Sequence, residues 1–522
     1  MEPRIGMDGV LLPRGVAIDA PDPWRAAIEA APVYDIANRS PLSPVPRLSA
    51  ALGNQVMLKR EDLQPVFSFK LRGAYNRLSQ LSVQERRRGV LAVSAGNHAQ
   101  GMALAAQHLG LDAVIVMPTT APGIKVDNVR ALGAEAVLHG DGFDDALEKG
   151  RELMAEGRVM VPPFDDPDIV VGQGTVAREL LEQHPGRPDV VFIPVGGGGL
   201  CAGMAAYLKA VDPTIRVVAV EPDDAACFAA ARAAGAPVDL AQVGLFVDGC
   251  AVKRVGSTTF ALMDRHVDEV VTVSSDAVCA AIRDIFQDLR VIAEPAGALA
   301  IAGMRAWVER TGTVGEDLVA VLSGANMNFD RLPYIAERAE IGMAAEALFG
   351  VTIPEEKGSF LAFCRAVGRR AVTEFNYRHR DARQAEVFVG VALSRGRAEE
   401  VEIAADLRTS GYAVTDLTAS EVARLHVRYM VGGAATGIAR ERIFRFEFPE
   451  RPGALLYFLE TLGGRWDITL FHYRNRGAAY GRVLAGFAVA EGDDAAFLTD
   501  LTSIGYWFTE ETGNPALAQF LA

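Results

Sequence analysis

Short apolar runs alternate with longer helical patterns over residues 54–326, and this alternation constrains the fold of the 522-residue chain more than any other feature. The apolar runs are rich in Val, Ile and Ala, and most end in glycine, proline or serine. Strands of this kind, separated by helices, pair in parallel, and helices cover both faces of the sheet. Ligands then gather beyond the carboxyl ends of the strands. The strand-like runs are VMLKR, VLAVSAG, AVIVMP, EAVLHG, VVFIPVGGGG, VVAVEP and DLVAVLSGAN.

The sequence after about Ala339 contains an internal repeat. The segment starting at Thr352 is similar to the segment starting at Glu447. Each copy predicts a strand, a glycine turn, a helix, two strands, and then a further helix and strand, which is the order of a ferredoxin-like α+β unit. The matched pairs are Pro354 and Pro449, Gly358 and Gly453, Phe363 and Phe458, Gly368 and Gly463, Phe375 and Phe471, and Tyr377 and Tyr473.

Composition excludes several classes of protein. Acidic residues outnumber basic ones by 66 to 52, so no broad basic surface is available for nucleic acid. The uncharged stretch Val190–Leu208 is long enough to span a membrane, but Pro194 and four glycines divide it, so we expect no membrane span. The first residues contain no export signal, and the five cysteines form no CxxC pair. We therefore expect a cytoplasmic chain without disulfides or zinc.

A lysine lies within an apolar segment at Ser68–Ala74, SFKLRGA. Phe67, Phe69 and Leu71 flank Lys70, and a desolvated amine loses its charge more readily and can attack a carbonyl carbon. Taken alone, the same pattern also fits a solvated surface lysine.

The run SAGNHAQG at Ser94–Gly101 joins a strand-like run to a helical pattern. Free N–H groups at a helix start bind anions such as a carboxylate, and Gly96 would permit close approach. An ordinary helix cap formed by Ser94 or Asn97 explains the run equally well. We interpret His98 as a hydrogen-bonded structural residue, because the spacing identifies no partner carboxylate.

Four consecutive glycines at Gly196–Gly199 give the strongest local signal. They lie between a strand-like run and a helical pattern, so several N–H groups are free to bind a phosphate. The run lacks the GK[ST] of a nucleotide P-loop. It does contain a GxGxxA spacing from Gly197 to Ala202, and Glu221 ends the next strand, as in a dinucleotide site. A nicotinamide-dependent dehydrogenase is therefore an alternative.

Two further residues could bring polar groups to the same sheet edge. Ser323, in the run SGAN, could donate a hydrogen bond to a ligand or accept one from it. Taken alone, it is better explained as a helix cap. Glu294, in the run EPAG, could supply a carboxylate there. It could equally be a charged residue in the first turn of a helix that starts with Pro295.

Together these runs resemble the fold type II pyridoxal-phosphate enzymes. SFKLRGAYN, SAGNHAQG, GGGGL and SGAN occur in that order. With its paired tail, the chain is similar to the biosynthetic threonine dehydratases (threonine ammonia-lyases) along nearly its whole length, including VPPFDDP, VGQGT and GLFVDGCAVKR. The resemblance implies an α/β catalytic domain of two open, twisted parallel-sheet subdomains, like the β subunit of tryptophan synthase. Tandem α+β ferredoxin-like regulatory domains, which are ACT-like, would follow.

The resemblance also implies a role for each matching residue. Lys70 would hold pyridoxal 5'-phosphate as a Schiff base, and Phe69 would lie against the ring. Asn97 would hydrogen-bond the phenolic oxygen of the ring, and Ser323 would face the pyridine nitrogen. The phosphate would bind the backbone N–H groups of Gly196, Gly197, Gly198, Gly199 and Leu200. The substrate carboxylate would bind the loop of Ser94, Ala95, Gly96, Asn97 and His98.

The implied reaction eliminates the hydroxyl of L-threonine as water, and hydrolysis of the resulting imine then gives 2-oxobutanoate and ammonia. This is the first step of isoleucine biosynthesis, and L-serine would react less. The freed amine of Lys70 would take the Cα proton. Ser323 is a neutral donor, so the pyridine nitrogen need not be protonated, and elimination should compete well against transamination. No residue of the sequence is identifiable as the acid that protonates the leaving hydroxyl.

Two departures from related enzymes refine this expectation. Some relatives bind a cation near the positions of Glu221 and Ala225, but Cys227 stands where the second acid is expected, so we predict that no metal is required. Ala95 lacks the hydroxyl that related racemases use as an acid or base, which favours elimination over racemisation.

The tail resembles the paired regulatory domains of the biosynthetic enzymes. This implies inhibition by isoleucine, relief by valine, and a homotetramer whose conformational equilibrium the tail biases. A dimerisation or stability module is the alternative. We expect a catalytic domain at 1–340, a linker at 341–346, regulatory domains at 347–419 and 442–513 separated by a linker at 420–441, and a C-terminal tail at 514–522.

Two other functions remain as alternatives. A dehydrogenase would use the glycine run but gives no reason for SFK and SGAN to accompany it. A catalytically silent amino-acid sensor would need none of Lys70, Asn97 and Ser323.

Overall fold

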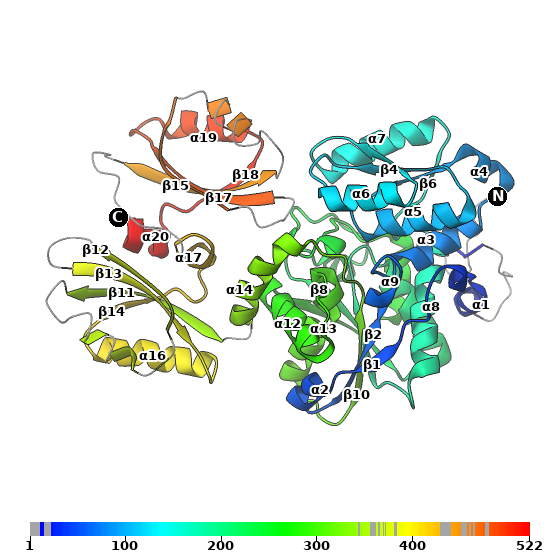
Figure 1. Ribbon diagram of the computed structural model, residues 1–522, viewed down its shortest axis with the longest axis horizontal. Helices are drawn as coiled ribbons and strands as arrows, with labels where there is room; N and C mark the ends of the chain where they lie inside the picture. The colour runs from blue at the N-terminus through cyan, green and yellow to red at the C-terminus, as the bar shows by residue number, and fades with distance from the viewer. Residues whose placement is uncertain are drawn as a thin grey trace. The chain divides into compact units, whose positions relative to one another are not determined.

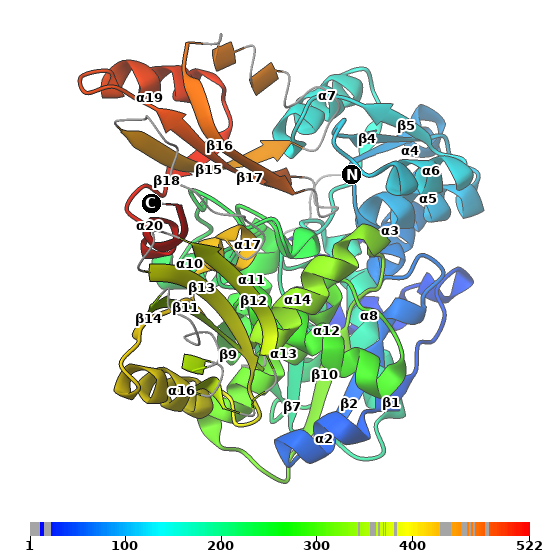
Figure 2. The same ribbon diagram turned by 60° about the vertical axis from the view of Figure 1, so that its left-hand side comes forward.

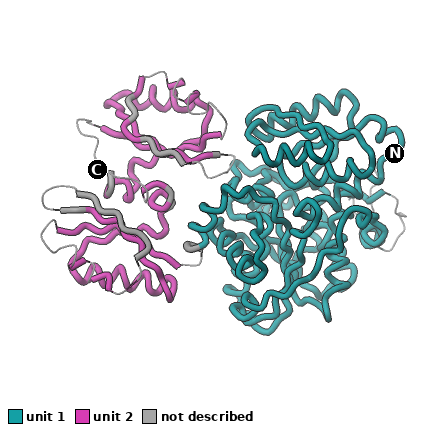
Figure 3. The backbone as a smooth tube through the Cα atoms, in the orientation of Figure 1, with its two compact units in different colours: residues 1–339 teal, residues 340–522 magenta. Residues whose placement is uncertain are grey.

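The computed structural model divides into two compact units, residues 1–339 and residues 340–522 (Figure 3). The structure describes residues 11–14, 22–342, 345–354, 362–363, 366–368, 370, 372–379, 384–427, 440–449, 457–458, 461–462, 465–474 and 480–521.

The seven predicted strands of the first unit are all present and lie in two sheets (Figure 1). Four of them pair in parallel in a six-stranded sheet of order β1-β2-β10-β7-β8-β9. The other three pair in parallel in a four-stranded sheet of order β5-β4-β3-β6. The predicted strands are β2 (Gln55–Arg60), β3 (Val90–Val93), β4 (Ala113–Met117), β5 (Glu135–Leu138), β7 (Val190–Pro194), β8 (Arg216–Pro222) and β10 (Asp317–Leu322).

Helices cover both faces of the larger sheet, as the apolar runs predict. Alternate residues of β7 point to opposite faces: Val191 and Ile193 belong to one buried cluster, and Val190 and Phe192 belong to another. A strand buried on both faces has no polar side, which is why VVFIP contains no polar residue. The helices of this unit are α1 (Pro23–Ala30), α2 (Pro46–Leu52), α3 (Lys70–Ser79), α4 (Val83–Arg88), α5 (Asn97–Leu109), α6 (Gly123–Ala131), α7 (Phe143–Ala155), α8 (Pro167–Gln183), α9 (Gly199–Val211), α10 (Cys227–Ala234), α11 (Ser257–His266), α12 (Ser275–Leu289), α13 (Pro295–Thr311) and α14 (Leu332–Gly342).

Three strands were not predicted. The strand β1 (Leu42–Pro44) pairs antiparallel at one edge of the larger sheet, and β6 (Val159–Met160) has only two residues. Both are too short to produce a recognisable pattern. The strand β9 (Glu269–Val273) lies at the other edge, where Glu269 and Thr272 interrupt the apolar run.

The second unit contains two four-stranded antiparallel sheets with the same order, as the repeat predicts. The first is β12-β13-β11-β14, and the second is β16-β17-β15-β18 (Figures 1 and 2). Phe363 and Phe458, which match in the repeat, are each fully buried in the core of their own copy. The elements are β11 (Glu346–Pro354), β12 (Val372–His379), β13 (Gln384–Ala392), α16 (Arg397–Thr409), β14 (Ala413–Asp416), α17 (Glu421–Leu425), β15 (Glu441–Pro449), β16 (Asp467–Arg474), β17 (Tyr480–Ala488), α19 (Asp494–Ser503), β18 (Trp507–Glu510) and α20 (Pro515–Leu521).

The hydrogen bonds of the two copies also repeat. The N–H of Leu348 donates to Thr418 Oγ1 at 3.0 Å in the first copy, and the N–H of Ile443 donates to Thr512 Oγ1 at 3.0 Å in the second. Of the matched glycines, Gly358, Gly453 and Gly463 lie outside the described residues. Gly368 is described and has a φ of 79°.

The two copies share a hydrophobic layer that the sequence did not reveal. Helix α17 lies in the segment 420–441, which we expected to be a linker, and α20 lies in the expected tail. Both helices lie between the two sheets (Figure 1). Gln519 of α20 donates to Glu386 of β13 at 2.9 Å, which links the end of the chain to the first copy. The buried residues of the layer are Leu348, Phe388, Leu417, Val422, Ala423, Val427, Ile443, Leu484, Ala516 and Leu517.

Candidate active site

The segment before Lys70 lies beside the end of β10, some 250 residues away along the chain. The N–H of Phe69 donates to the Ser323 carbonyl at 3.3 Å, and the N–H of Ala325 donates to the Phe67 carbonyl at 2.9 Å. Ser68 and Gly324 form an isolated bridge between these bonds. The structure thus brings the lysine and the serine of the two predicted runs to the same edge of the larger sheet.

Lys70 is the first residue of α3, and its amine is held in a low-polarity setting. Nζ donates to the Pro163 carbonyl at 3.2 Å and lies 5.2 Å from the centre of the Phe69 ring. Burial lowers the pKa of Lys70 to about 8, although Cys250 and Glu294 act in the opposite direction. A substantial fraction of this amine is therefore neutral near physiological pH, as a nucleophile or base requires.

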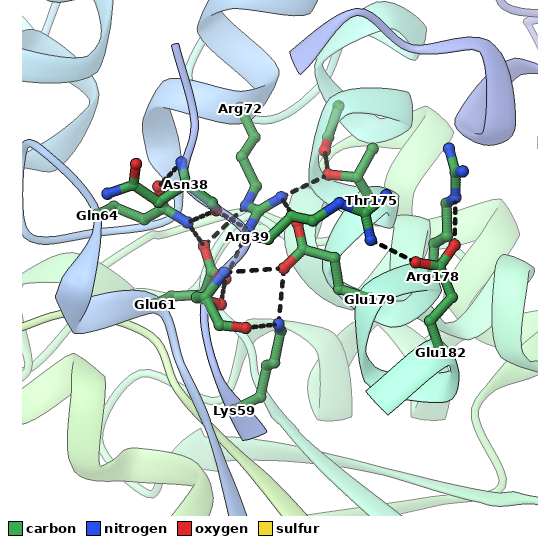
Figure 4. A network of polar contacts seen from close by, with 12 residues as sticks. Asn38, Arg39, Lys59, Glu61, Gln64, Arg72, Thr175, Arg178, Glu179 and Glu182 are labelled. Carbon is green, nitrogen blue, oxygen red and sulfur yellow. Dashed lines mark hydrogen bonds and ion pairs between the residues drawn. The ribbon is translucent and has the colours of Figure 1, made fainter. Parts of the chain in front are cut away.

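A buried ionic network anchors the helix that carries Lys70 (Figure 4). Arg72 donates to both oxygens of Glu61, at 2.8 and 2.9 Å, and to Glu179 Oε1 at 2.6 Å. Lys59 donates to the other oxygen of Glu179 at 2.7 Å. These four side chains are fully buried and come from β2, the turn that follows it, α3 and α8. The network therefore fixes the first turn of α3 against two other elements.

The four glycines form the predicted connection between β7 and α9. The carbonyl of Gly196 accepts from Cys227 Sγ at 3.3 Å, and the carbonyl of Gly197 accepts from Thr259 Oγ1 at 2.7 Å. Within the described part of the chain, the backbone N–H groups of residues 196–200 donate to no acceptor. Because five donors without an acceptor lie at the positive end of a helix, this loop is suited to a phosphate.

The start of α5 has the arrangement expected of an anion-binding loop. Helix α5 begins at Asn97, and its preceding residue, Gly96, provides no side-chain cap. The Gly96 N–H donates to Ser94 Oγ at 3.1 Å, whereas the N–H groups of Asn97 and His98 have no acceptor among the described residues. Ala95 is half-buried beside them.

The hydrogen bond of His98 and its pKa do not suit a role as a catalytic acid or base. Its Nε2 lies 3.1 Å from the Val161 carbonyl, so this nitrogen carries a proton and donates it. Burial, together with the positive charge of Lys70, lowers the pKa of His98 to about 3. The ring is therefore neutral, and its contact agrees with a structural role.

Asn97 and Ser323 both have side chains near the Lys70 segment. Asn97 Nδ2 donates to Glu294 Oε1 at 2.6 Å, and Asn97 Oδ1 accepts from Asn326 at 2.9 Å. Ser323 is buried, and its hydroxyl donates to the Ala296 carbonyl at 3.1 Å. A hydroxyl can rotate about its C–O bond, so it can donate to a ligand instead.

Hydrogen bonds from the protein backbone hold the carboxyl group of Glu221. Its two oxygens accept from the N–H groups of Phe228 and Ala229, at 2.7 and 2.8 Å. Burial raises the pKa of Glu221 to about 7 despite these bonds. Both carboxyl oxygens accept at the start of α10, and this arrangement accounts for the Glu221 side chain without a ligand. In the part of the chain that the structure describes, no three His, Cys, Asp or Glu side chains form a group that could hold a metal ion.

The arrangement fits pyridoxal 5'-phosphate. It combines a partly neutral lysine, five free N–H groups for a phosphate, an amide and a neutral hydroxyl in one region. Sequence reasoning missed several neighbours of Lys70, among them the Pro163 carbonyl and Cys250. Both lie in runs that carry the resemblance, VPPFDDP and GLFVDGCAVKR, but no local pattern assigned them a position near the lysine.

Comparison with known families and proteins supports the same conclusion. Residues 33–324 match the pyridoxal-phosphate dependent enzyme family, and residues 337–427 and 432–521 match the C-terminal regulatory domain of threonine dehydratase. A biosynthetic L-threonine dehydratase of Escherichia coli is 53% identical over 95% of this chain and 96% of its own length.

Two solved structures are similar to the chain. Threonine deaminase isoform 2 from Solanum lycopersicum, in its processed form, has a TM-score of 0.59 and 44% identity, covering 65% of this chain and 99% of that one. A threonine deaminase from T.th. has a TM-score of 0.55 and 38% identity, covering 58% of this chain and 98% of that one. With a family match over more than half of its length and relatives that align along nearly all of it, the chain belongs to the pyridoxal-phosphate-dependent threonine dehydratases that carry a C-terminal regulatory domain.

Proposed function

We propose that the site around Lys70 converts L-threonine to 2-oxobutanoate and ammonia, as the first step of isoleucine biosynthesis. The same site would dehydrate and deaminate L-serine more slowly. The observation that carries this proposal is the amine of Lys70, whose pKa burial lowers to about 8 beside a loop of free N–H groups. Such an amine can bind a carbonyl cofactor and can later accept a proton from carbon.

Pyridoxal 5'-phosphate, when bound, withdraws electrons from the Cα of an amino acid and so makes its proton easier to remove. We assign the removal of that proton to Lys70 Nζ. The N–H groups of residues 196–200 would hold the phosphate, and Phe69 would lie against the ring. Asn97 would bind the phenolic oxygen, and the Ser323 hydroxyl would face the ring nitrogen without adding charge.

We assign the substrate carboxylate to the loop of residues 94–98. The N–H groups of Asn97 and His98 are available there at the start of α5. Since His98 is neutral and donates to a backbone carbonyl, it holds the loop in place and transfers no proton. Ala95 offers no hydroxyl on this side, in agreement with elimination rather than racemisation.

The assignment is tested by incubating the purified protein with L-threonine and measuring 2-oxobutanoate and ammonia. We expect equal amounts of the two products, and a yellow protein without added nicotinamide. A colourless protein whose activity requires added nicotinamide would favour the dehydrogenase alternative. Engagement of both Glu221 oxygens already weighs against that alternative.

Replacing Gly198 with alanine is expected to weaken cofactor binding about tenfold. An alanine in a left-handed conformation costs roughly 1–2 kcal/mol, and the loop can relieve this cost only by leaving the conformation that presents its N–H groups to the phosphate. Gly198 has a φ of 95°, and a Cβ there would lie 2.9 Å from Thr259 Cβ. The dissociation constant can be measured by cofactor titration. Gly186→Ala is the matched control, since a Cβ there meets nothing within 4 Å. Equal affinity of the Gly198 variant and the control would contradict the assignment of the loop.

Treatment with EDTA is expected to leave the rate of threonine turnover unchanged. Cys227 occupies the place of the second expected acid, and its Sγ donates to the Gly196 carbonyl. Burial raises the pKa of Cys227 to about 12, so the thiol stays protonated and is a poor metal ligand. Loss of activity that only a divalent ion restores would overturn this prediction.

We further propose that the tail is the allosteric part of the enzyme, with isoleucine inhibiting, valine relieving the inhibition, and a homotetramer as the active form. We also propose a catalytic domain at 1–340 and regulatory domains at 347–419 and 442–513. The hydrophobic layer that contains α17 and α20 supports this role, because residues of both copies pack in it. A ligand that moves the elements of one copy would therefore also affect the other copy.

Isoleucine is expected to inhibit the full chain, and valine to reverse that inhibition. A chain ending at residue 342, where α14 ends, should remain active but lose the response to both amino acids. Light scattering should give about four times the chain mass of 55.8 kDa for the full protein. An isoleucine response that survives the truncation would contradict the regulatory role of the tail.

A cytoplasmic location agrees with the state of the cysteines. The four described cysteines, Cys201, Cys227, Cys250 and Cys279, are buried and unpaired, as is usual in a reducing compartment. None of the described helices combines the length and the apolar character needed to cross a bilayer.

A further inference from the structure

Glu294 is a buried carboxyl that the proposed reaction leaves without a role. It immediately precedes α13, and the residue is only 4% exposed. The sequence allowed two interpretations: a carboxylate at the sheet edge, or a charged residue at a helix start. The side chain makes no capping bond to its own helix and instead accepts from Asn97 Nδ2 at 2.6 Å.

The contact with Glu294 determines how the amide of Asn97 is oriented. An asparagine amide has a donating end and an accepting end, and a carboxylate can only accept. When Glu294 is ionised, the NH₂ of Asn97 must therefore face it, which turns the Asn97 Oδ1 toward the Nδ2 of Asn326, 2.9 Å away. One N–H of the Asn97 amide is used by Glu294, and the second is left for a ligand.

The turn after β10 leaves room for this carboxyl. A Cβ on Gly324 would lie 2.4 Å from Glu294 Oε1, so no other residue leaves the carboxyl in this position. The N–H of Glu294 also donates to the Gly324 carbonyl at 3.2 Å. The SGAN turn therefore holds both Glu294 and Asn326 around the amide of Asn97.

A buried carboxyl at this place is unfavourable by itself. Burial raises the pKa of Glu294 to about 7, and nearby Asp248 acts in the same direction, while Lys125, Asn97 and Arg331 oppose them. Burying a carboxyl costs free energy because its charged form loses hydration. A carboxyl buried in spite of this cost, and close enough to Lys70 to affect its pKa, is a candidate for a functional role.

We propose that Glu294 is a positioning residue, which fixes the amide of Asn97 and thereby the hydrogen bond from that amide to the phenolic oxygen of the cofactor. This inference rests on the cofactor-binding role proposed for Asn97. Glu294 needs no contact with substrate for this task, and it acts on the cofactor only through Asn97.

A double-mutant cycle on the full-length protein tests this proposal. The variants are Asn97→Ala, Glu294→Ala and the double variant, and the measurements are the dissociation constant of the cofactor and the visible absorption maximum of the loaded enzyme. We expect Asn97→Ala to weaken cofactor binding about tenfold and Glu294→Ala about three- to tenfold, the range for one lost hydrogen bond. In the Asn97→Ala background, the Glu294 substitution should then change the affinity by less than about twofold.

Equal effects of Glu294→Ala in both backgrounds would overturn the proposal, because a purely structural role does not depend on Asn97. If the alanine variant does not fold, the same cycle applies with Glu294→Met, a side chain of similar length without a carboxyl or amide oxygen to accept from Asn97. Glu309→Ala, on the exposed face of the same helix, is the control and should match the wild type. Unchanged affinity and absorption in Asn97→Ala would refute the cofactor role of Asn97 itself. That result differs from equal effects of Glu294→Ala in both backgrounds, which would refute only the role of Glu294.

Discussion

Replacing Lys70 with alanine is expected to lower the rate of threonine dehydration by about 10⁴-fold or more, because one amine both holds the cofactor and removes the Cα proton. Lys70→Arg should be equally inactive, since a guanidinium does not deprotonate in proteins. The rate is measured as 2-oxobutanoate formed at saturating L-threonine and cofactor.

The matched control is Lys149→Ala. Lys149 lies on α7 and pairs at the surface with Glu152 at 2.8 Å, so its loss should leave the rate unchanged. Far-ultraviolet circular dichroism of each variant should equal that of the wild type. A Lys70→Ala protein that folds normally and retains a tenth of the wild-type rate would show that another group performs the chemistry.

Replacing Arg72 with methionine is expected to reduce the free energy of unfolding of the catalytic unit by about 3–5 kcal/mol, the usual result of removing one partner from a buried ionic network. Lys59 and Arg72 balance Glu61 and Glu179, and all four side chains are fully buried (Figure 4). Burial alone would raise the pKa of Glu61, but the charge and hydrogen bonds of Arg72 lower it, so this carboxylate stays ionised. Without Arg72, two buried carboxylates share one lysine.

The neighbouring pair Arg39–Glu182 provides the control, because it lies at the surface of the same region. Its side chains are 51% and 40% exposed, and Arg39→Met should change the stability by less than about 1 kcal/mol. Urea unfolding of the apoenzyme of both variants measures the difference. Equal stabilities of the two variants would show that the buried network contributes no more than a surface ion pair.

The parallel-sheet core was predictable because burial on both faces leaves a clear pattern. VVFIP and DLVAVL have no polar side to present, and β7 and β10 lie where those runs predicted. The edge strands were missed for the opposite reason. A two-residue strand such as β6 has no periodicity, and β9 contains two polar residues, Glu269 and Thr272, which need not be buried.

The candidate site was predictable only in part. Local chemistry indicated a phosphate loop at Gly196–Gly199, but Lys70 alone could have been a surface lysine, and only the order of several runs gave it a role. Glu294 and Arg72 show the limit of sequence reasoning. A charged residue gives no sign of whether it will be buried, so the partners of Asn97 and the network beneath α3 required the fold.

The proposed chemistry depends on one covalent bond, between Lys70 and the cofactor, and reduction followed by mass spectrometry detects that bond. Borohydride treatment of the yellow protein should remove its colour and add the mass of the reduced cofactor to one peptide, the one that contains Lys70. A label on any other residue, or none, would contradict the account.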